Sequence, residues 1–111
     1  MSFRPLKDFP GYEISTDGVV RSWRMRGRAA PGASAREAHE VTPIWLKSNR
    51  WAVRLNKDGK RFLRCVANLV LETFVGPAPE GVGHAKNEAD VLFLDGDPAN
   101  ISLKNLNWRM Q

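Results

Sequence analysis

The sequence has little of the chemistry that builds covalent or metal cross-links. Among its 111 residues it contains one cysteine, Cys65, and two histidines, His39 and His84. A single cysteine cannot form an internal disulfide, and no group of cysteines and histidines has the spacing of zinc ligands. We therefore expect no disulfide framework, no metal site and no cofactor, and we expect Cys65 to be a small buried hydrophobic residue.

Long hydrophobic runs are also absent. No apolar stretch approaches the roughly 20 residues that cross a bilayer as a helix. The first residues, Met-Ser-Phe-Arg-Pro, contain no apolar signal region. The sequence therefore predicts a protein without a membrane partner, in a reducing cytosol that agrees with its single cysteine.

Charge is present in excess of one sign and is unevenly distributed. The 111 residues suit a single domain, and 42% hydrophobic with 26% charged residues is an ordinary globular balance. Residues 1–64 hold 14 Lys/Arg and 6 Asp/Glu, whereas residues 65–111 hold 3 Lys/Arg and 6 Asp/Glu. The basic half indicates a phosphate-bearing partner, although a merely solvated surface would have the same composition.

The first half of the chain predicts mainly strands. Residues 12–15 and 19–23 alternate apolar and polar side chains around Asp17-Gly18, a dipeptide typical of hairpin turns. Residues 24–40 contain several arginines, glycines and alanines, and we expect a flexible basic loop there. A second hairpin is predicted from residues 51–55 to 61–64, after a short strand near Ile44 and Leu46. In that hairpin Arg54 and Asn56 share a face, with Arg61 and Lys57 expected nearby.

The second half predicts one helix and a compact turn. Apolar residues recur at steps of three and four over residues 66–74, which indicates a short helix that Gly76-Pro77 ends. Residues 77–90 look like a loop, and 91–94 like a buried strand. Asp95-Gly96-Asp97-Pro98 forms a turn, and Ser102 is a candidate N-cap for one helical turn. Trp45, Trp51 and Trp108 are expected in the core. The elements together predict an α+β fold of small antiparallel sheets with one short helix.

The order of these motifs resembles a phage-type HNH homing endonuclease. Residues 9–22 (FPGYEISTDGVVRS) are similar to its N-terminal NUMOD-type motif, and residues 69–77 are similar to its helix. Residues 94–100 with Asn105-Leu106-Asn107-Trp108 resemble the HNH turn and its end. The resemblance divides the single domain, 1–111, into the NUMOD-type hairpin (1–23), the basic loop (24–40), a hairpin plus helix (41–76) and an HNH element, ββα-like and degenerate (77–111).

The departures from that family indicate lost catalysis. Where the resemblance implies a general base and a metal-ligating carboxylate, this sequence has Phe93 and Leu92, which can neither accept a proton nor bind magnesium. The helix histidine falls on Ala67, and the Asn-Asn pair becomes Asn100-Ile101. The metal-binding helix that would follow Trp108 is not in the sequence. We therefore expect no catalytic residue and no enzyme activity.

Two groups of basic and aromatic residues are candidates for binding nucleic acid. Arginine forks bind phosphate oxygens, and an aromatic ring among them can stack a base. The first group lies in 21–28 and comprises Arg21, Trp23, Arg24, Arg26 and Arg28. The second lies in the central β region and comprises Lys47, Arg50, Trp51, Arg54, Lys57, Lys60, Arg61 and Arg64. For the first group, a core tryptophan among solvated arginines is an equal reading.

Three functions stay open at this point. The first is a non-catalytic protein that binds nucleic acid. The second is a phage counter-defence protein that captures a signalling nucleotide or blocks a host defence protein in the host cytosol, with a homo-oligomer allowed. The third is a nuclease with a rewired site built from His84, Asp95, Asp97 and Asn100.

Overall fold

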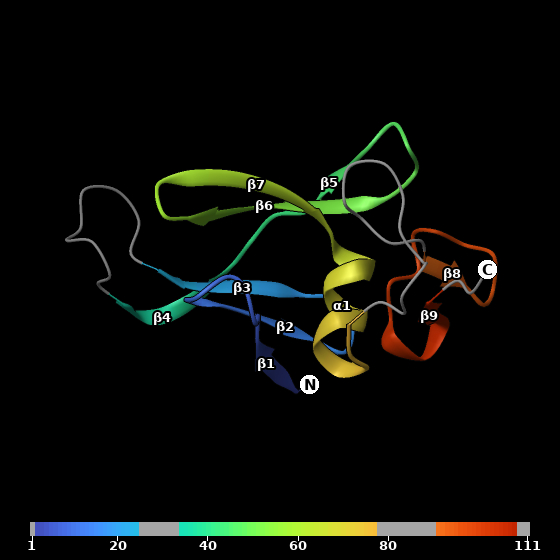
Figure 1. The fold of residues 1–111 in the computed structure, drawn as a ribbon, viewed down its shortest axis with the longest axis horizontal. Coiled ribbons are helices and arrows are strands. Elements are labelled where there is room, and N and C mark those ends of the chain that lie inside the picture. Colours follow the sequence, from blue (N-terminus) through green and yellow to red (C-terminus); the bar gives the residue numbers. More distant parts are fainter. Residues whose placement is uncertain (1, 25–33, 78–90, 109–111) are drawn as a thin grey trace.

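A four-stranded antiparallel sheet forms the N-terminal part of the fold. The computed structural model describes residues 2–24, 34–77 and 91–108. The sheet has the order β1 (Phe3–Pro5), β2 (Tyr12–Ser15), β3 (Val20–Arg24), β4 (Ser34–Glu40) (Figure 1). The Ser15 hydroxyl accepts hydrogen bonds from the backbone N–H groups of Asp17 and Val19. These bonds close the predicted turn between β2 and β3.

One element of this sheet corrects the expectation of a loop over residues 24–40. Residues 34–40 form β4, which pairs with β3 through Arg21 opposite Glu40 and Ser22 opposite His39. The alanines and charged residues of this segment have weak strand propensity, but pairing with a formed neighbour outweighs it. Charged residues are also typical of edge strands, because they discourage further pairing.

The second sheet and the helix follow each other without a break. The sheet consists of β5 (Ile44–Trp45), β6 (Trp51–Lys57) and β7 (Lys60–Cys65), and α1 spans Val66–Phe74, as predicted. The helix has no side-chain N-cap and no acidic residue in its first turn, whereas six of its nine residues are buried. Tertiary packing therefore stabilises this helix more than capping does. Cys65, expected to be buried, is half-buried where the helix begins.

A two-stranded sheet completes the described part of the chain. It pairs β8 (Val91–Phe93) with β9 (Leu106–Trp108), and a 3-10 helix, Leu103–Asn105, precedes β9. Ser102 occupies the N-cap position but makes no side-chain cap. The Trp108 indole N–H donates to the Gly76 carbonyl at 3.2 Å, so this sheet is attached to the end of α1.

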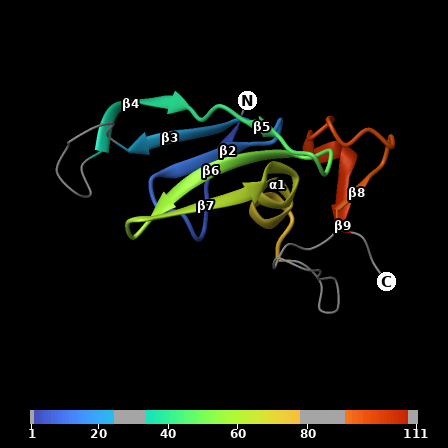
Figure 2. The same ribbon diagram turned by 90° about the horizontal axis from the view of Figure 1, so that it is seen from above.

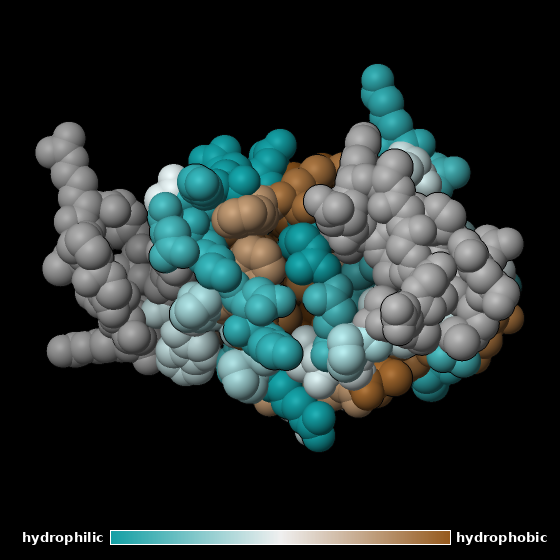
Figure 3. Space-filling view, in the orientation of Figure 1, coloured by the Kyte–Doolittle hydropathy of each residue, from teal (hydrophilic) through white to brown (hydrophobic). Residues whose placement is uncertain are grey.

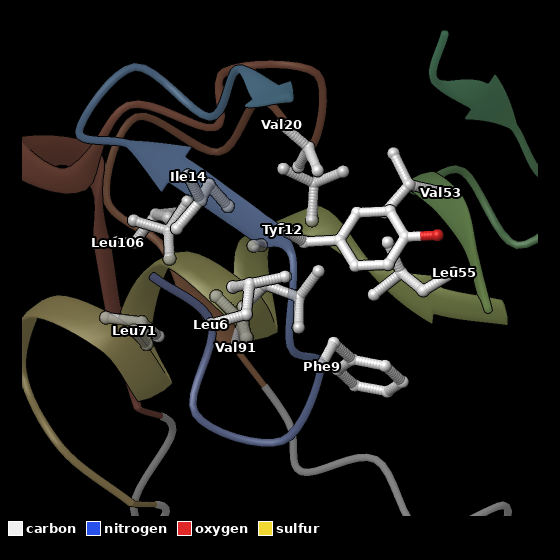
Figure 4. Packing of buried hydrophobic residues seen from close by; sticks show 14 of the residues in the cluster. Leu6, Phe9, Tyr12, Ile14, Val20, Val53, Leu55, Leu71, Val91 and Leu106 are labelled. Carbon is white, nitrogen blue, oxygen red and sulfur yellow. The ribbon is translucent and has the colours of Figure 1, made fainter. Parts of the chain in front are cut away.

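The core lies between the first two sheets and against α1. Strands β6 and β7 run over β2 and β3, and α1 covers one end of both sheets (Figures 1 and 2). The Tyr12 ring enters the space beside Val53 and Leu55, which are almost fully buried (Figure 4). Each such buried aliphatic side chain stabilises the fold by about 1.5–3 kcal/mol. Among the described residues, no helix has the length and hydrophobicity needed to cross a membrane.

Candidate nucleic-acid interface

The β6–β7 hairpin is shaped by its two-residue turn. Asp58 and Gly59 have φ values of 52° and 75°, the left-handed conformations of the turn that matches strand twist. The turn places Lys57 opposite Lys60, Asn56 opposite Arg61 and Arg54 opposite Leu63. Because side chains alternate along a strand, this register decides which residues share a face.

The outer face of the hairpin carries Arg54, Asn56, Arg61 and Leu63. All four residues are exposed, and Leu63 is 50% exposed. The predicted proximity of Arg61 to Arg54 and Asn56 is confirmed, because Asn56 and Arg61 are direct cross-strand partners. Lys57 does not join them, since alternation places it on the side of Val53 and Leu55. The outer face therefore combines two guanidinium groups, an amide and an aliphatic side chain, with no carboxylate among them.

Two lysines flank the turn of the same hairpin. Lys60 is exposed and Lys57 is partly exposed, and hydrophilic residues gather over this end of the hairpin at the upper left of Figure 3. Within the described ranges, neither of the ion pairs found involves Lys57, Lys60, Arg54 or Arg61. The only acidic residue of the hairpin is Asp58 at its turn. The hairpin thus presents uncompensated positive charge.

Two other predicted residues of the central region are engaged within the fold. Arg64 forms an ion pair with Glu72 of α1, and its guanidinium also lies 6.0 Å from the centre of the Phe9 ring. Trp51 makes an edge-to-face contact with Trp45, with ring centres 5.0 Å apart. Trp45 is 43% exposed, so the expectation of a core position was wrong for this residue, because β5 lies at the sheet edge. Trp108 is buried as expected.

The turn between β5 and β6 holds the remaining two predicted residues. Lys47 is exposed. The Arg50 guanidinium lies 4.9 Å from the centre of the Phe93 ring and donates to the Asn49 carbonyl at 2.9 Å. Stacking on an aromatic ring restricts an arginine without neutralising it. Arg50 therefore joins the second sheet to β8 and keeps its charge.

The first predicted group behaves differently, because Glu13 binds two of its members. Arg21 forms an ion pair with Glu13, and the Trp23 indole N–H donates to the same carboxylate at 2.8 Å. The Arg21 guanidinium also stacks on Phe3, 3.6 Å from the ring centre, and Glu40 is its partner on β4. The strand register alone could have revealed this cluster. Arg21 and Trp23 are thus poorer candidates for a phosphate ligand than the hairpin residues.

Of the three remaining residues of the first group, the structure describes only one. Arg24 belongs to the end of β3. Arg26 and Arg28 lie outside the described residues, as does His84.

The HNH-like turn is organised around one carboxylate. The Asn100 side-chain amide donates to Asp95 at 2.8 Å, and the Asp97 backbone N–H and the Asn105 amide donate to its other oxygen. Asn105 also accepts a hydrogen bond from the Asp95 backbone N–H and donates one to the Asn100 carbonyl, so it ties the turn to the β8–β9 hairpin. These bonds, the one from Asn100 foremost, lower the pKa of the Asp95 carboxyl. Both oxygens of this carboxylate therefore accept hydrogen bonds within the turn.

Three apolar residues lie near that turn. Leu92 is 44% exposed, and Phe93 is half-buried beneath Arg50. Ile101 packs against Gly18 of the first hairpin. Across residues 2–24, 34–77 and 91–108, no three His, Cys, Asp or Glu side chains gather in a way that could hold a metal ion.

No protein-family model and no curated protein matches the chain. Among solved structures, the chain is similar to the HNH homing endonuclease I-HmuI, in a structure that concerns DNA binding and cleavage by that enzyme. The TM-score is 0.73 at 23% sequence identity, and the match covers 100% of this chain and 53% of the other. The chain thus spans about half the length of I-HmuI, and all of it has the α+β fold of the matched part of that enzyme.

Proposed function

We propose that this chain is a non-catalytic nucleic-acid-binding protein whose β6–β7 hairpin contacts the nucleic acid. The observation that carries the proposal is the charge of this hairpin. Arg54 and Arg61 share the outer face of the hairpin, Lys57 and Lys60 flank its turn, and neither ion pair of the described residues involves any of the four. Uncompensated cations on one element are the electrostatic footprint expected of a phosphate-binding surface.

The fold agrees with a nucleic-acid partner. I-HmuI, which has the same fold, binds and cleaves DNA. Arg21 of the first predicted group, on the other sheet, offers less free charge, since Glu13 and Glu40 flank it across β2, β3 and β4. A nucleic acid would therefore meet the second sheet with less electrostatic repulsion.

The absence of catalysis rests on the side chains of β8. A hydrolytic site needs a base that accepts a proton and oxygen ligands for a divalent metal. Leu92 and Phe93 offer neither, and the Asp95 oxygens already accept three hydrogen bonds within the turn. The lack of a base and of free oxygen ligands at these three positions supports binding without cleavage.

Binding is tested by fluorescence anisotropy with a labelled DNA duplex, titrated between about 50 mM and about 200 mM salt. Affinity should fall steeply with salt, because bound cations release counterions from the duplex. Replacing two contacting lysines, in Lys57→Ala/Lys60→Ala, should reduce the slope of log K against log salt by about 1.8. Lys7→Ala/Lys104→Ala is the matched control, since it removes the same charge from exposed positions outside the hairpin. Equal slopes for the two double variants would refute the hairpin as the contact.

Catalysis is tested by incubating a supercoiled plasmid with the protein and magnesium or manganese. The proposal expects no nicking. Nicking that disappears in the His84→Ala variant would overturn the non-catalytic part of the proposal and leave the binding part intact.

A further inference from the structure

Trp45 places a large aromatic ring at the surface of the second sheet. This residue is 43% exposed, although tryptophan is on average one of the more buried residues of folded proteins. Trp45 and Trp51 are cross-strand partners and therefore share a face. Their rings meet edge to face, and Trp51 packs in turn against the hydrophobic core. Trp45 is therefore an exposed ring on a support that restricts its motion, which lowers the entropy lost when a ligand binds it.

The turn beside this ring carries positive charge. The Leu46 N–H donates to the Arg50 carbonyl and the Asn49 N–H donates to the Leu46 carbonyl, both at 2.9 Å. Lys47 is exposed in the middle of this closed turn, two residues after Trp45. Neither ion pair of the described residues involves Lys47 or Arg50. The turn therefore keeps uncompensated cations next to the ring.

The local sequence adds no negative charge that would offset these cations. Residues 41–57 contain four Lys/Arg and no Asp/Glu, so this segment attracts an anionic ligand. A nucleotide matches both features, because its base stacks on an aromatic side chain and its phosphate binds lysine or arginine. An uncharged apolar peptide would use the ring and leave the charge without a partner.

Stacking geometry decides which nucleotide of a DNA strand can bind this ring. Inside a duplex the neighbouring bases cover both faces of each base, so a side chain stacks on a base only after the base has left the stack. The β5–β6 turn and the β6–β7 turn lie at opposite ends of the second sheet (Figure 1). The seven residues of β6 between them extend for roughly 20 Å, about six phosphate steps along one strand of a duplex. One DNA molecule can therefore reach both turns.

We propose that Trp45 stacks on an unpaired base of a DNA strand while Lys47 contacts a phosphate beside that base. The inference rests on the proposed function and adds to it a preference for DNA that contains an unpaired base. This contact requires no base sequence, because every base has a face on which an aromatic ring can stack.

The test is fluorescence anisotropy with three labelled duplexes that differ at a single position. One is fully paired, one carries a bulged thymidine, and one carries an abasic nucleotide in place of that thymidine. The abasic duplex keeps the additional phosphate, so its comparison with the bulged duplex isolates the base. The wild-type protein should bind the bulged thymidine roughly 5- to 150-fold more tightly than the abasic nucleotide, as expected for one stacked base.

The variants assign this preference to one ring. Trp45→Ala should abolish the preference, and Trp45→Phe should restore part of it, since a phenyl ring also stacks. Phe62→Ala is the matched control, because it removes another exposed aromatic ring, from β7, and should leave the preference unchanged. Lys47→Ala should weaken binding to the bulged and abasic duplexes equally and reduce the salt slope by about 1.

The outcomes separate this inference from the proposed function. Equal affinity of the wild-type protein for the bulged and abasic duplexes overturns the inference even if Trp45→Ala does not fold, while binding to all three duplexes leaves the proposed function in place. A preference that persists in folded Trp45→Ala overturns the inference as well. Competition by thymidine monophosphate as strong as that by the bulged duplex overturns a DNA strand as the ligand. Failure of the wild-type protein to bind any nucleic acid overturns both proposals.

Discussion

Gly18 joins the N-terminal sheet to the loop that precedes β9, and replacing it by alanine tests this junction. Gly18 has a φ of +82°, and the neighbouring Thr16 carbonyl accepts the Leu103 N–H at 2.8 Å. An added Cβ would lie 2.6 and 2.7 Å from two side-chain carbons of Ile101 and 3.2 Å from its carbonyl oxygen. Since carbon atoms pack best at about 3.5–4.0 Å, Ile101 would have to move by roughly 1 Å.

The expected cost follows from these two features. The left-handed backbone costs a residue with a Cβ about 1–2 kcal/mol, and overpacking adds about 1–3 kcal/mol. We expect Gly18→Ala to lower the free energy of unfolding by about 2–5 kcal/mol. At about 4 °C per kcal/mol for a domain of this size, the Tm would fall by roughly 8–20 °C.

Two further variants separate the contributions in thermal and urea denaturation. Gly59 has a φ of +75° with no atom within 4 Å of an added Cβ, so Gly59→Ala should show only the backbone cost, about 1–2 kcal/mol. Ile101→Ala in the Gly18→Ala background should recover the overpacking cost as a coupling energy of about 0.5–3 kcal/mol. Equal destabilisation by Gly18→Ala and Gly59→Ala, with no coupling to Ile101, would refute the packing of this junction.

Three other predictions concern the turn and the hairpin. Asn105→Ala should destabilise the protein by about 1–3 kcal/mol in urea denaturation, because the buried Asn105 amide makes three hydrogen bonds to Asp95 and Asn100; a loss under a few tenths would contradict the network. Folding lowers the pKa of Asp95 below 3.8, so its stabilisation is present above that pH and is lost as the pH falls through the lower folded-state pKa. The urea midpoints of the wild type and Asp95→Asn should therefore converge on acidification, and a constant gap would disprove this. Tyr12→Phe leaves the Asn56 N–H without its acceptor and should cost about 0.5–1.5 kcal/mol, measurable by the same denaturation, whereas unchanged stability would count against the contact.

The parts of the fold that depend on local pattern could be predicted from the sequence. The helix over residues 66–74 follows from apolar side chains at steps of three and four, and the hairpins follow from Asp17-Gly18 and Asp58-Gly59. Strand β4 could not be predicted, since Ser34–Glu40 has weak strand propensity and pairs because β3 is its neighbour. Long-range pairing overrides propensity in such segments.

The candidate site likewise has features that local sequence pattern predicts and features that depend on long-range contacts. Alternation placed Arg54 and Asn56 on one face. The two-residue turn also fixes Leu63 opposite Arg54, so Leu63 could have been included in the predicted set, from which it is missing. The capture of Arg21 and Trp23 by Glu13 required the register of β2 and β3. The stacking of Arg50 on Phe93 joins residues far apart in the chain, and no local pattern indicates it.

The most direct test of the proposed interface is a ¹⁵N NMR titration of the protein with a DNA duplex. The account predicts shifts at the Asn56 side-chain amide and at the Nε–H groups of Arg54 and Arg61. The signal of the Trp23 indole N–H, which donates to Glu13, should stay in place. Shifts at the Trp23 indole and Arg21, with the hairpin signals unchanged, would contradict the account and assign binding to the other sheet.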